Sequence, residues 1–600
     1  MSSTPPAATA IHEPVVLQDW TPIASCLDFQ LGQLAFQRRG AQAFTTNEVP
    51  NLVNQGGLAA VRAAEVLFAS CAEAAAHEAL EAEIVVVEIA MGMGVHAVQL
   101  LDRFQQRCRA AGVDWYDRLT FYATDVTPRM LQDARERGVF DRHQGRVVLA
   151  QADARRPDRV RRIDDGAIVD LAGVPRMFVH TYLLCVLPAN VFRWEPAGDA
   201  GDDGDTGVAA APDDELAGRR GRWKVLVART MLRQPGLLDR FTSLPLAELQ
   251  ARIARADPEE AQDLADLYPL LDLDLSLAPV AAGDLPDLDV LHAIGAQILS
   301  ARTTNEQSGP VWVLHSGGAM RSIEATLAAL RPDGVLLYRD YGPGTAKDSD
   351  APHLYQHYGP TTAMGINHFA IDRWIRDSVD GDGRPRWTWA GPTDDHAAMI
   401  KTRLLGRAMP APVAAVFAEA FSLESFAHLE RVIANARAAT TAAAVMEGYR
   451  EALRLEPENW ALLGEAAEAA LRGQRSLDLA EVLIREALRI NPWSSAAAWN
   501  VLGDVLYFRG DIHSAEGAYR RATLVNPEHA RGWFNLYLCA RQRADHAQAV
   551  EMAARALAMD RDGVESERLG AALRDAITRL QEQQALASRL RKERAAGAHR

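Results

Sequence analysis

A repeat with a period of 34 residues occupies the last part of the chain and restricts the fold more than any other sequence feature. One unit contains Trp499, Leu502, Gly503, Ala515, Tyr519, Ala522 and Pro527. One period toward the C-terminus lie Trp533, Leu536, Ala549 and Ala556. Toward the N-terminus, after a short insertion near Gln474, lie Trp460, Leu463, Gly464, Ala480, Ala487 and Pro492. Such a period predicts paired helices that bury their apolar faces only by stacking on neighbouring units.

The positions of this repeat have distinct packing roles. Small Ala and Gly side chains fit where two helices touch, Trp and Tyr fill the gaps, and Pro ends the second helix. The pattern resembles the tetratricopeptide repeat (TPR), and a partial unit with Tyr449, Ala452 and Pro457 precedes the complete ones. The resemblance implies an all-α TPR solenoid over residues 426–575.

A TPR solenoid would bind a protein partner or substrate on its concave face. By the register of the family, that face would include Asn500, Asp504, Tyr507 and Arg541. The alternative is that the repeats only brace the preceding domain.

Earlier in the chain, short apolar runs alternate with helical segments. The expected strands are 84–90, 119–125, 146–150 and 176–188, and the expected helices between them include 95–111 and 127–138. The first strand is a continuous run rich in β-branched residues, which is typical of parallel strands buried on both faces. The alternation predicts an α/β Rossmann-like domain with a doubly wound, mostly parallel sheet.

A loop with two glycines follows the first expected strand and precedes a helix. Gly92 and Gly94 would let a ligand approach the backbone, and the helix N-terminus offers free N–H groups. Three acids accompany the loop: Glu88 precedes it, Asp125 ends the second strand and Asp153 follows the third. Open α/β sheets bind ligands at this carboxyl edge, although glycine turns of this kind also serve purely structural ends.

The acids bear on the choice between two adenosine-containing cofactors. GMGVHA, residues 92–97, matches the GxGxxA pattern of NAD-type sites. However, Glu88 would place a second negative charge beside a pyrophosphate. S-adenosylmethionine carries an ammonium and a sulfonium and no phosphate, so the electrostatics favour it as the cofactor. Asp125 is well placed to accept hydrogen bonds from the ribose hydroxyls.

Residues 88–94 resemble the first motif of the class I S-adenosylmethionine-dependent methyltransferases, with Ala90 in place of the first glycine. The resemblance implies that Glu88, Ala90, Gly92 and Gly94 belong to the cofactor site. It also implies Asp125 at the ribose, Asp153 near the adenine amine, and residues 180–188 beside the methyl group.

Finer features are similar to the MidA-like branch of that family, which is associated with methylation of protein arginine. They are the Leu187-Pro188 ending, the later run RWKVLV and the run VLLYRDYG. The acidic positions that the branch has before Leu-Pro are Thr181, Tyr182 and Cys185 in this chain.

Methyl transfer to an acceptor needs positioning and desolvation rather than a nucleophilic triad. A general base matters only where the acceptor begins protonated, and the candidates are Tyr182, Asp340 and His357. Each has a structural alternative, because a lone His in an aromatic loop is more often a packing residue. The His, Asp and Glu residues show no convincing metal-ligand spacing, so we expect no metal.

Composition and segment boundaries complete the expectations. The net charge of −15 argues against binding nucleic acid or an anionic membrane, and five scattered cysteines fit a cytoplasmic protein. We expect a leader and docking segment at 1–55, a methyltransferase domain at 56–400, a linker at 401–425 and a charged helical tail at 576–600. The domain would carry an acidic loop at 195–220 and a helical insertion at 231–308.

The predicted function is a methyltransferase acting on a protein that the repeats recruit. The alternatives are a TPR adaptor with a degenerate domain and an NAD-dependent oxidoreductase.

Overall fold

The computed structural model divides into two compact units. The α/β unit comprises Met1–Gly40 and Arg62–Leu423, and the helical unit comprises Ala41–Val61 and Glu424–Arg600. The structure describes residues 14–46, 48–49, 57–197, 214–232, 245, 248, 251, 267–302, 309–351, 356–358, 361–391, 400–473, 475–560 and 563–597. Most of the predicted acidic loop 195–220 lies outside these residues.

A nine-stranded mixed sheet forms the centre of the α/β unit, in the order β16-β17-β13-β7-β2-β3-β4-β5-β6 within the described residues. Strand β16 (Thr388–Ala390) lies at one edge, and β5 (Arg159–Arg162) and β6 (Ile168–Asp170) lie at the other. Its parallel strands are β2 (Ile84–Ile89), β3 (Leu119–Asp125), β4 (Val147–Ala152), β7 (Met177–Thr181) and β13 (Val335–Tyr341). The chain visits β2, β3 and β4 in one direction and then β7 and β13 in the other. The predicted strands are therefore present, and the order reverses between β2 and β7.

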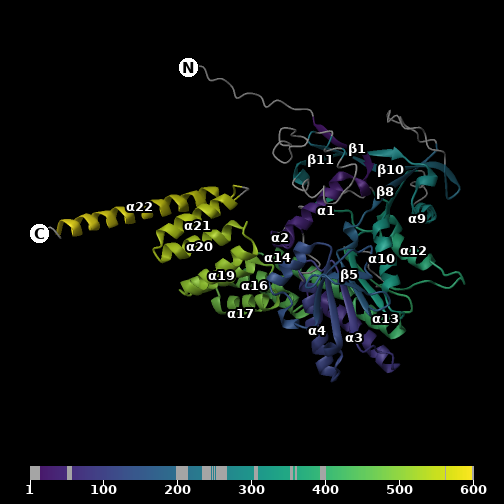
Figure 1. The fold of residues 1–600 in the computed structure, drawn as a ribbon, viewed down its shortest axis with the longest axis horizontal. Coiled ribbons are helices and arrows are strands. Elements are labelled where there is room, and N and C mark those ends of the chain that lie inside the picture. Colours follow the sequence, from purple (N-terminus) through teal and green to yellow (C-terminus); the bar gives the residue numbers. More distant parts are fainter. Residues whose placement is uncertain are drawn as a thin grey trace, which may run out of the picture. The chain divides into compact units, whose positions relative to one another are not determined.

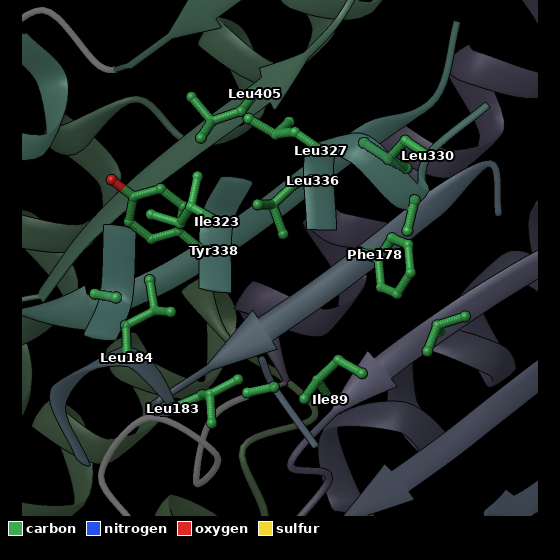
Figure 2. Packing of buried hydrophobic residues seen from close by; sticks show 14 of the residues in the cluster. Ile89, Phe178, Leu183, Leu184, Ile323, Leu327, Leu330, Leu336, Tyr338 and Leu405 are labelled. Atoms are coloured by element: carbon green, nitrogen blue, oxygen red, sulfur yellow. The ribbon is translucent and has the colours of Figure 1, made fainter. Parts of the chain in front are cut away.

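Apolar side chains on one face of this sheet pack beneath helix α10 (Gly317–Ala329). Figure 2 shows Ile89, Phe178, Leu336 and Tyr338 of the strands packed with residues of α10 and of the segment after β7. Glu88 lies between Val87 and Ile89 in β2, so its side chain points to the opposite face of the sheet. There it meets His96 of helix α4 (Val95–Ala111), which places α4 on that face. The sheet thus has helices on both faces.

Two expectations for the strands differ from the structure. The predicted strand 176–188 ends at Thr181, because Tyr182 has a φ of +58°, and a 3₁₀ turn (Leu184–Val186) follows. The predicted linker 401–425 instead contains β17 (Ile400–Gly406), which pairs antiparallel with β13, and helix α13 (Ala411–Ala420). The sequence does not indicate this strand, because it contains charged residues, which usually lie at the surface. In the structure Arg403 is buried and forms an ion pair with Asp372 at 2.8 Å.

A second sheet in the α/β unit is six-stranded within the described residues and antiparallel. Its strands are β1 (Val15–Pro22), β8 (Asn190–Pro196), β9 (Asp214–Leu216), β10 (Arg219–Leu232), β11 (Leu271–Pro279) and β12 (Val311–His315). Residues 15–22, expected within a leader, therefore belong to a sheet. The expected helical insertion 231–308 contains helix α9 (Leu288–Ala301) but also β11, whose alternation of Leu with polar residues has the period of a strand.

The helical unit is built from antiparallel helix pairs stacked on one another (Figure 1). The helices are α14 (Leu423–Ala438), α15 (Ala442–Leu455), α16 (Trp460–Gly473), α17 (Leu477–Ile490), α18 (Ala496–Phe508), α19 (Ile512–Val525), α20 (Ala530–Gln542), α21 (His546–Met559) and α22 (Ser566–Gly597). The prediction of an all-helical C-terminal part is confirmed. The expected boundary at 575–576 falls inside the continuous helix α22, whose first half packs on α21 and whose remainder is exposed.

A short N-terminal segment belongs to this helical unit. Helix α2 (Gln42–Thr45) lies in the segment Ala41–Val61, and Thr45 accepts a hydrogen bond from Asn526. Farther along the segment, the backbone N–H of Leu58 donates to Glu456 at 2.8 Å. The described helices include none that is both long enough and apolar enough to cross a membrane.

Candidate functional site

The loop between β2 and α4 is held in an unusual backbone conformation. Ala90, Gly92 and Gly94 have φ values of +61°, +55° and +73°. This left-handed region is open to glycine but costs roughly 1–2 kcal/mol for a residue with a Cβ. Ala90 therefore adopts a backbone conformation that favours glycine, and strain of this kind gathers at functional sites.

Gly94 has a second constraint besides its φ. A Cβ at this position would lie 2.9 Å from Cζ of Phe140 and 3.1 Å from Cγ1 of Val139. Protein side chains therefore fill the space that a Cβ of Gly94 would occupy. Close approach of a ligand to the backbone at Gly94 stays a prediction. Gly94 is the N-cap residue of α4 and, as a glycine, has no side chain that could accept from the first backbone N–H groups of the helix. The N-terminus of α4 therefore lies at the loop without a side-chain cap.

Glu88 and His96 join the two ends of this loop. Nδ1 of His96 lies 3.0 Å from Oε1 of Glu88, and both side chains are buried. Oε2 of Glu88 is also buried and has no hydrogen-bond partner among the described residues. A buried carboxylate oxygen without a donor is costly, so Glu88 offers an acceptor for a donor that binds at the loop.

Asp125 lies at the end of β3, next to the loop. Its Oδ1 accepts a hydrogen bond from the N–H of Thr127 at 2.9 Å, and its Oδ2 accepts a long one from the N–H of Gly92 at 3.4 Å. Burial raises the pKa of Asp125 to about 6, against the lowering effect of these N–H groups. Asp125 is therefore in contact with the loop and with the start of the segment after β3.

Asp153 follows β4 but is engaged elsewhere. Arg155 binds both carboxylate oxygens of Asp153, with Nη2 2.6 Å from Oδ2 and Nε 3.0 Å from Oδ1. Partial burial raises the pKa of Asp153, but the hydrogen bonds and charge of Arg155 outweigh it, and the pKa lies below its ordinary value. This carboxylate is therefore already engaged by Arg155 in the structure.

Two tyrosines meet at the ends of β7 and β13. The ring centroids of Tyr182 and Tyr341 lie 5.5 Å apart, and Tyr182 is the residue with the left-handed backbone. The candidate base Asp340 lies next to them but is buried, with Oδ2 accepting from the N–H of Cys185 at 3.0 Å and Oδ1 from that of Tyr341 at 2.9 Å. Burial raises the pKa of Asp340 to about 6. Asp340 thus links the end of β13 to the segment after β7.

The α/β unit contains the candidate base His357 and the buried histidines His180 and His368. His357 lies in β14 (Gln356–Tyr358), apart from the loop in sequence, and its side chain lies outside the described residues. His180 is buried at the end of β7, where desolvation lowers its pKa to about 3. His368 stacks on Tyr338, and desolvation lowers its pKa well below the ordinary value. His180 and His368 are therefore neutral in the folded chain at pH 7.

Sequence reasoning missed His96. Its position, two residues after Gly94, is the available signal, because a side chain in the first turn of the helix can reach back to the strand before the loop. No group of three or more His, Cys, Asp or Glu side chains in the described part of the chain is arranged to hold a metal ion.

The predicted partner surface of the repeats is partly internal. Asn500 is buried, donates to the carbonyl of Ala496 and accepts from Asn535 at 3.0 Å. Asp504 accepts from Tyr519 at 2.8 Å and pairs with Arg531 at 2.6 Å. Asn500 and Asp504 therefore connect neighbouring helix pairs. Asp504 and Tyr507 are half-buried and Arg541 is exposed, so these three keep part of their surface in solvent.

Comparisons with known proteins leave the family open. No family model and no curated protein sequence matches the chain. Two solved structures that resemble part of it are titled "Crystal structure of MamA" and "Crystal structure of MamA protein". The first is 15% identical, covering 24% of this chain and 91% of its own with a TM-score of 0.20. The second is 16% identical, covering 26% and 89% with a TM-score of 0.22, and scores this low do not establish a shared fold.

Proposed function

We propose that the α/β unit is an S-adenosylmethionine-dependent methyltransferase and that the helical unit recruits its protein substrate or partner. The observation that carries the proposal is the set of two buried carboxylates, Glu88 and Asp125, around the left-handed loop of residues 90–94. One of their oxygens, Oε2 of Glu88, lacks a partner among the described residues.

The position of this loop in the sheet supports a ligand site. The strand order reverses between β2 and β7, and open α/β sheets bind ligands at the carboxyl ends of the strands where such a reversal occurs. The loop follows β2, Asp125 ends β3, and Tyr182 follows β7. Residues from three neighbouring strands therefore lie at one edge of the sheet.

The charges at the loop support a cationic cofactor over a dinucleotide. A pyrophosphate at the N-terminus of α4 would bring two further negative charges near Glu88, whose carboxylate is buried and therefore weakly screened. The ammonium and sulfonium of S-adenosylmethionine would instead be attracted. When bound, this cofactor supplies a methyl group on an already activated carbon.

The roles of the protein residues follow from their positions. Asp125 would accept hydrogen bonds from the ribose hydroxyls, and Glu88 would accept one from the ammonium group. Tyr182 and Tyr341 would form an apolar wall that excludes water from the acceptor. Asp340 would brace this wall, because it accepts from the N–H groups of Cys185 and Tyr341 and so connects the segment after β7 to the end of β13.

For the helical unit, recruitment of a protein is supported by the stacked helix pairs, which build an extended surface. Asp504, Tyr507 and Arg541 are the predicted contact residues that keep exposed surface. Linking a recruiting surface to a catalytic unit raises the local concentration of substrate at the site.

A second candidate function is a TPR adaptor whose α/β unit has lost its activity. It is favoured by the ion pair between Asp153 and Arg155, which occupies a carboxylate expected at the cofactor, and by Ala90 in place of a glycine. Under this alternative the chain would capture partners but bind no cofactor.

Isothermal titration calorimetry on the full chain tests these candidates together. We expect S-adenosylmethionine and S-adenosylhomocysteine to bind and NAD to give no heat of binding. Binding of NAD alone would indicate an oxidoreductase, and binding of none of the three would favour the adaptor. A pull-down with the helical unit then tests recruitment: if it captures none of the proteins that the full chain captures, the recruitment proposal is wrong.

A further inference from the structure

The Glu88–His96 pair is placed to control what the loop binds. The two residues lie at the two ends of the segment that contains Ala90, Gly92 and Gly94, and their side chains meet at 3.0 Å. Both belong to regular elements, since Glu88 is in β2 and His96 is in the first turn of α4. The contact therefore fixes the carboxylate with respect to the strand and to the helix N-terminus.

The two oxygens of Glu88 are not equivalent. Oε1 is engaged by His96, whereas Oε2 is buried and without a hydrogen-bond partner within the described residues. Without His96, the carboxylate would be free to rotate, and neither oxygen would be held toward a ligand. A fixed acceptor loses less conformational entropy when a ligand binds than a mobile one does.

We propose that His96 is a positioning residue that holds Oε1 of Glu88, so that Oε2 receives the ammonium group of the cofactor and the loop selects a cationic ligand. This inference rests on the proposed function, because it names the residue that gives that site its charge preference. His96 itself does not touch the reacting atoms.

Two probes separate this role from a merely structural one. S-adenosylmethionine carries the ammonium group, whereas 5′-methylthioadenosine has the same adenosine part and no amino acid part. Calorimetry on the full chain with both probes compares wild type, His96→Leu and His96→Gln. The matched control is His77→Leu, because His77 forms a comparable pair with Glu73 at 3.2 Å on the exposed side of helix α3 (Leu58–Ala76).

We expect His96→Leu to weaken S-adenosylmethionine binding at least tenfold while 5′-methylthioadenosine binding changes less than twofold. His96→Gln should restore most of the affinity, because its amide can donate to Oε1 of Glu88, and His77→Leu should bind as wild type. Should His96→Leu fail to fold, Glu88→Gln serves in its place, with the same selective loss expected.

The inference is overturned if the two probes weaken in parallel, or if His96→Leu binds S-adenosylmethionine as wild type does. A wild-type chain that binds 5′-methylthioadenosine but not S-adenosylmethionine would also overturn it. If wild type binds neither probe, the proposed function itself fails, which is a distinct result.

Discussion

The side-chain amide of Asn526 donates a hydrogen bond of 3.0 Å to the carbonyl oxygen of Thr45, although 481 positions separate the two residues. Both residues are buried. Next to this bond, Gln42 donates to Glu528 at 2.9 Å, so α2 is attached at the junction between α19 and α20. The helical unit is therefore completed by a segment from near the N-terminus.

This attachment predicts that a fragment of residues 421–600 folds into helices but is less stable without the segment 41–61. Three hydrogen bonds at about 1 kcal/mol each, together with buried Ala43 and Val49, suggest a deficit of about 2–4 kcal/mol. Urea unfolding followed by circular dichroism, with and without a 41–61 peptide in excess, measures this deficit in the free energy of unfolding.

Asn526→Asp provides the matched control for that experiment. The variant keeps an acceptor for the N–H of Glu528 but lacks the donor to Thr45. The peptide should therefore stabilise the Asn526→Asp fragment less than the wild-type fragment. Equal free energies of unfolding with and without peptide in the wild-type fragment would contradict the prediction.

Asp125→Ala should weaken S-adenosylmethionine binding by roughly ten- to a hundredfold, because hydrogen bonds to a carboxylate contribute about 1.5–3 kcal/mol. Asp125→Asn should have a smaller effect, since it keeps an acceptor for the N–H of Thr127. Calorimetry measures both, with the exposed Asp117→Asn as control. Unchanged affinity in a folded Asp125→Ala chain would remove this residue from the site.

Asp340 should make the stability of the α/β unit depend on pH. Burial raises the folded-state pKa of Asp340 to about 6. The contribution of Asp340 to the free energy of unfolding is therefore present below the unfolded-state pKa near 4 and is lost as the pH rises to about 6. The Asp340→Asn variant lacks this pH-dependent contribution to stability. The free-energy cost of the substitution should therefore be larger at pH 4.5 than at pH 7, by about 2 kcal/mol, in urea unfolding. A cost that does not change with pH would show that Asp340 does not titrate in this range.

Ala90→Gly should stabilise the α/β unit by about 0.5–1 kcal/mol. Glycine adopts the left-handed conformation of Ala90 without strain, which outweighs its greater freedom in the unfolded chain. Ala110→Gly, at an exposed position of helix α4, should destabilise by about the same amount. Thermal unfolding that shifts in the same direction for both variants would argue against strain at Ala90.

Gly94→Ala should lower both the stability of the α/β unit and its affinity for cofactor. The new Cβ would lie 2.9 Å from Phe140 in a backbone conformation that alanine disfavours. Gly112→Ala, at the other end of α4, has a similar φ but open space around its Cβ. It should cost about 1 kcal/mol in stability and leave cofactor affinity unchanged. Equal losses of affinity in the two variants would contradict a specific role for the loop.

Local sequence determined the elements that carry the candidate site. The β-branched run of Val85–Val87 predicts β2, and the helix expected at 95–111 matches α4 (Val95–Ala111), because strand and helix patterns repeat over short distances. The 34-residue period likewise predicts the helix pairs of the C-terminal part. By contrast, the sequence does not indicate β17, since it contains Lys401 and Arg403. Both are buried in the fold, and Arg403 forms an ion pair with Asp372, 31 positions earlier.

Which of the predicted residues are available to a ligand was decided by tertiary structure alone. Glu88, Asp125 and Asp340 read as three acids in the sequence, yet only the fold determines that Asp340 is satisfied by backbone N–H groups and that Oε2 of Glu88 is not. Asn500 reads as a surface residue but is buried against Asn535 of the next repeat. Burial and hydrogen-bond partners depend on residues brought together from distant positions, so the sequence determined where the polar groups occur and the fold determined which remain free to bind.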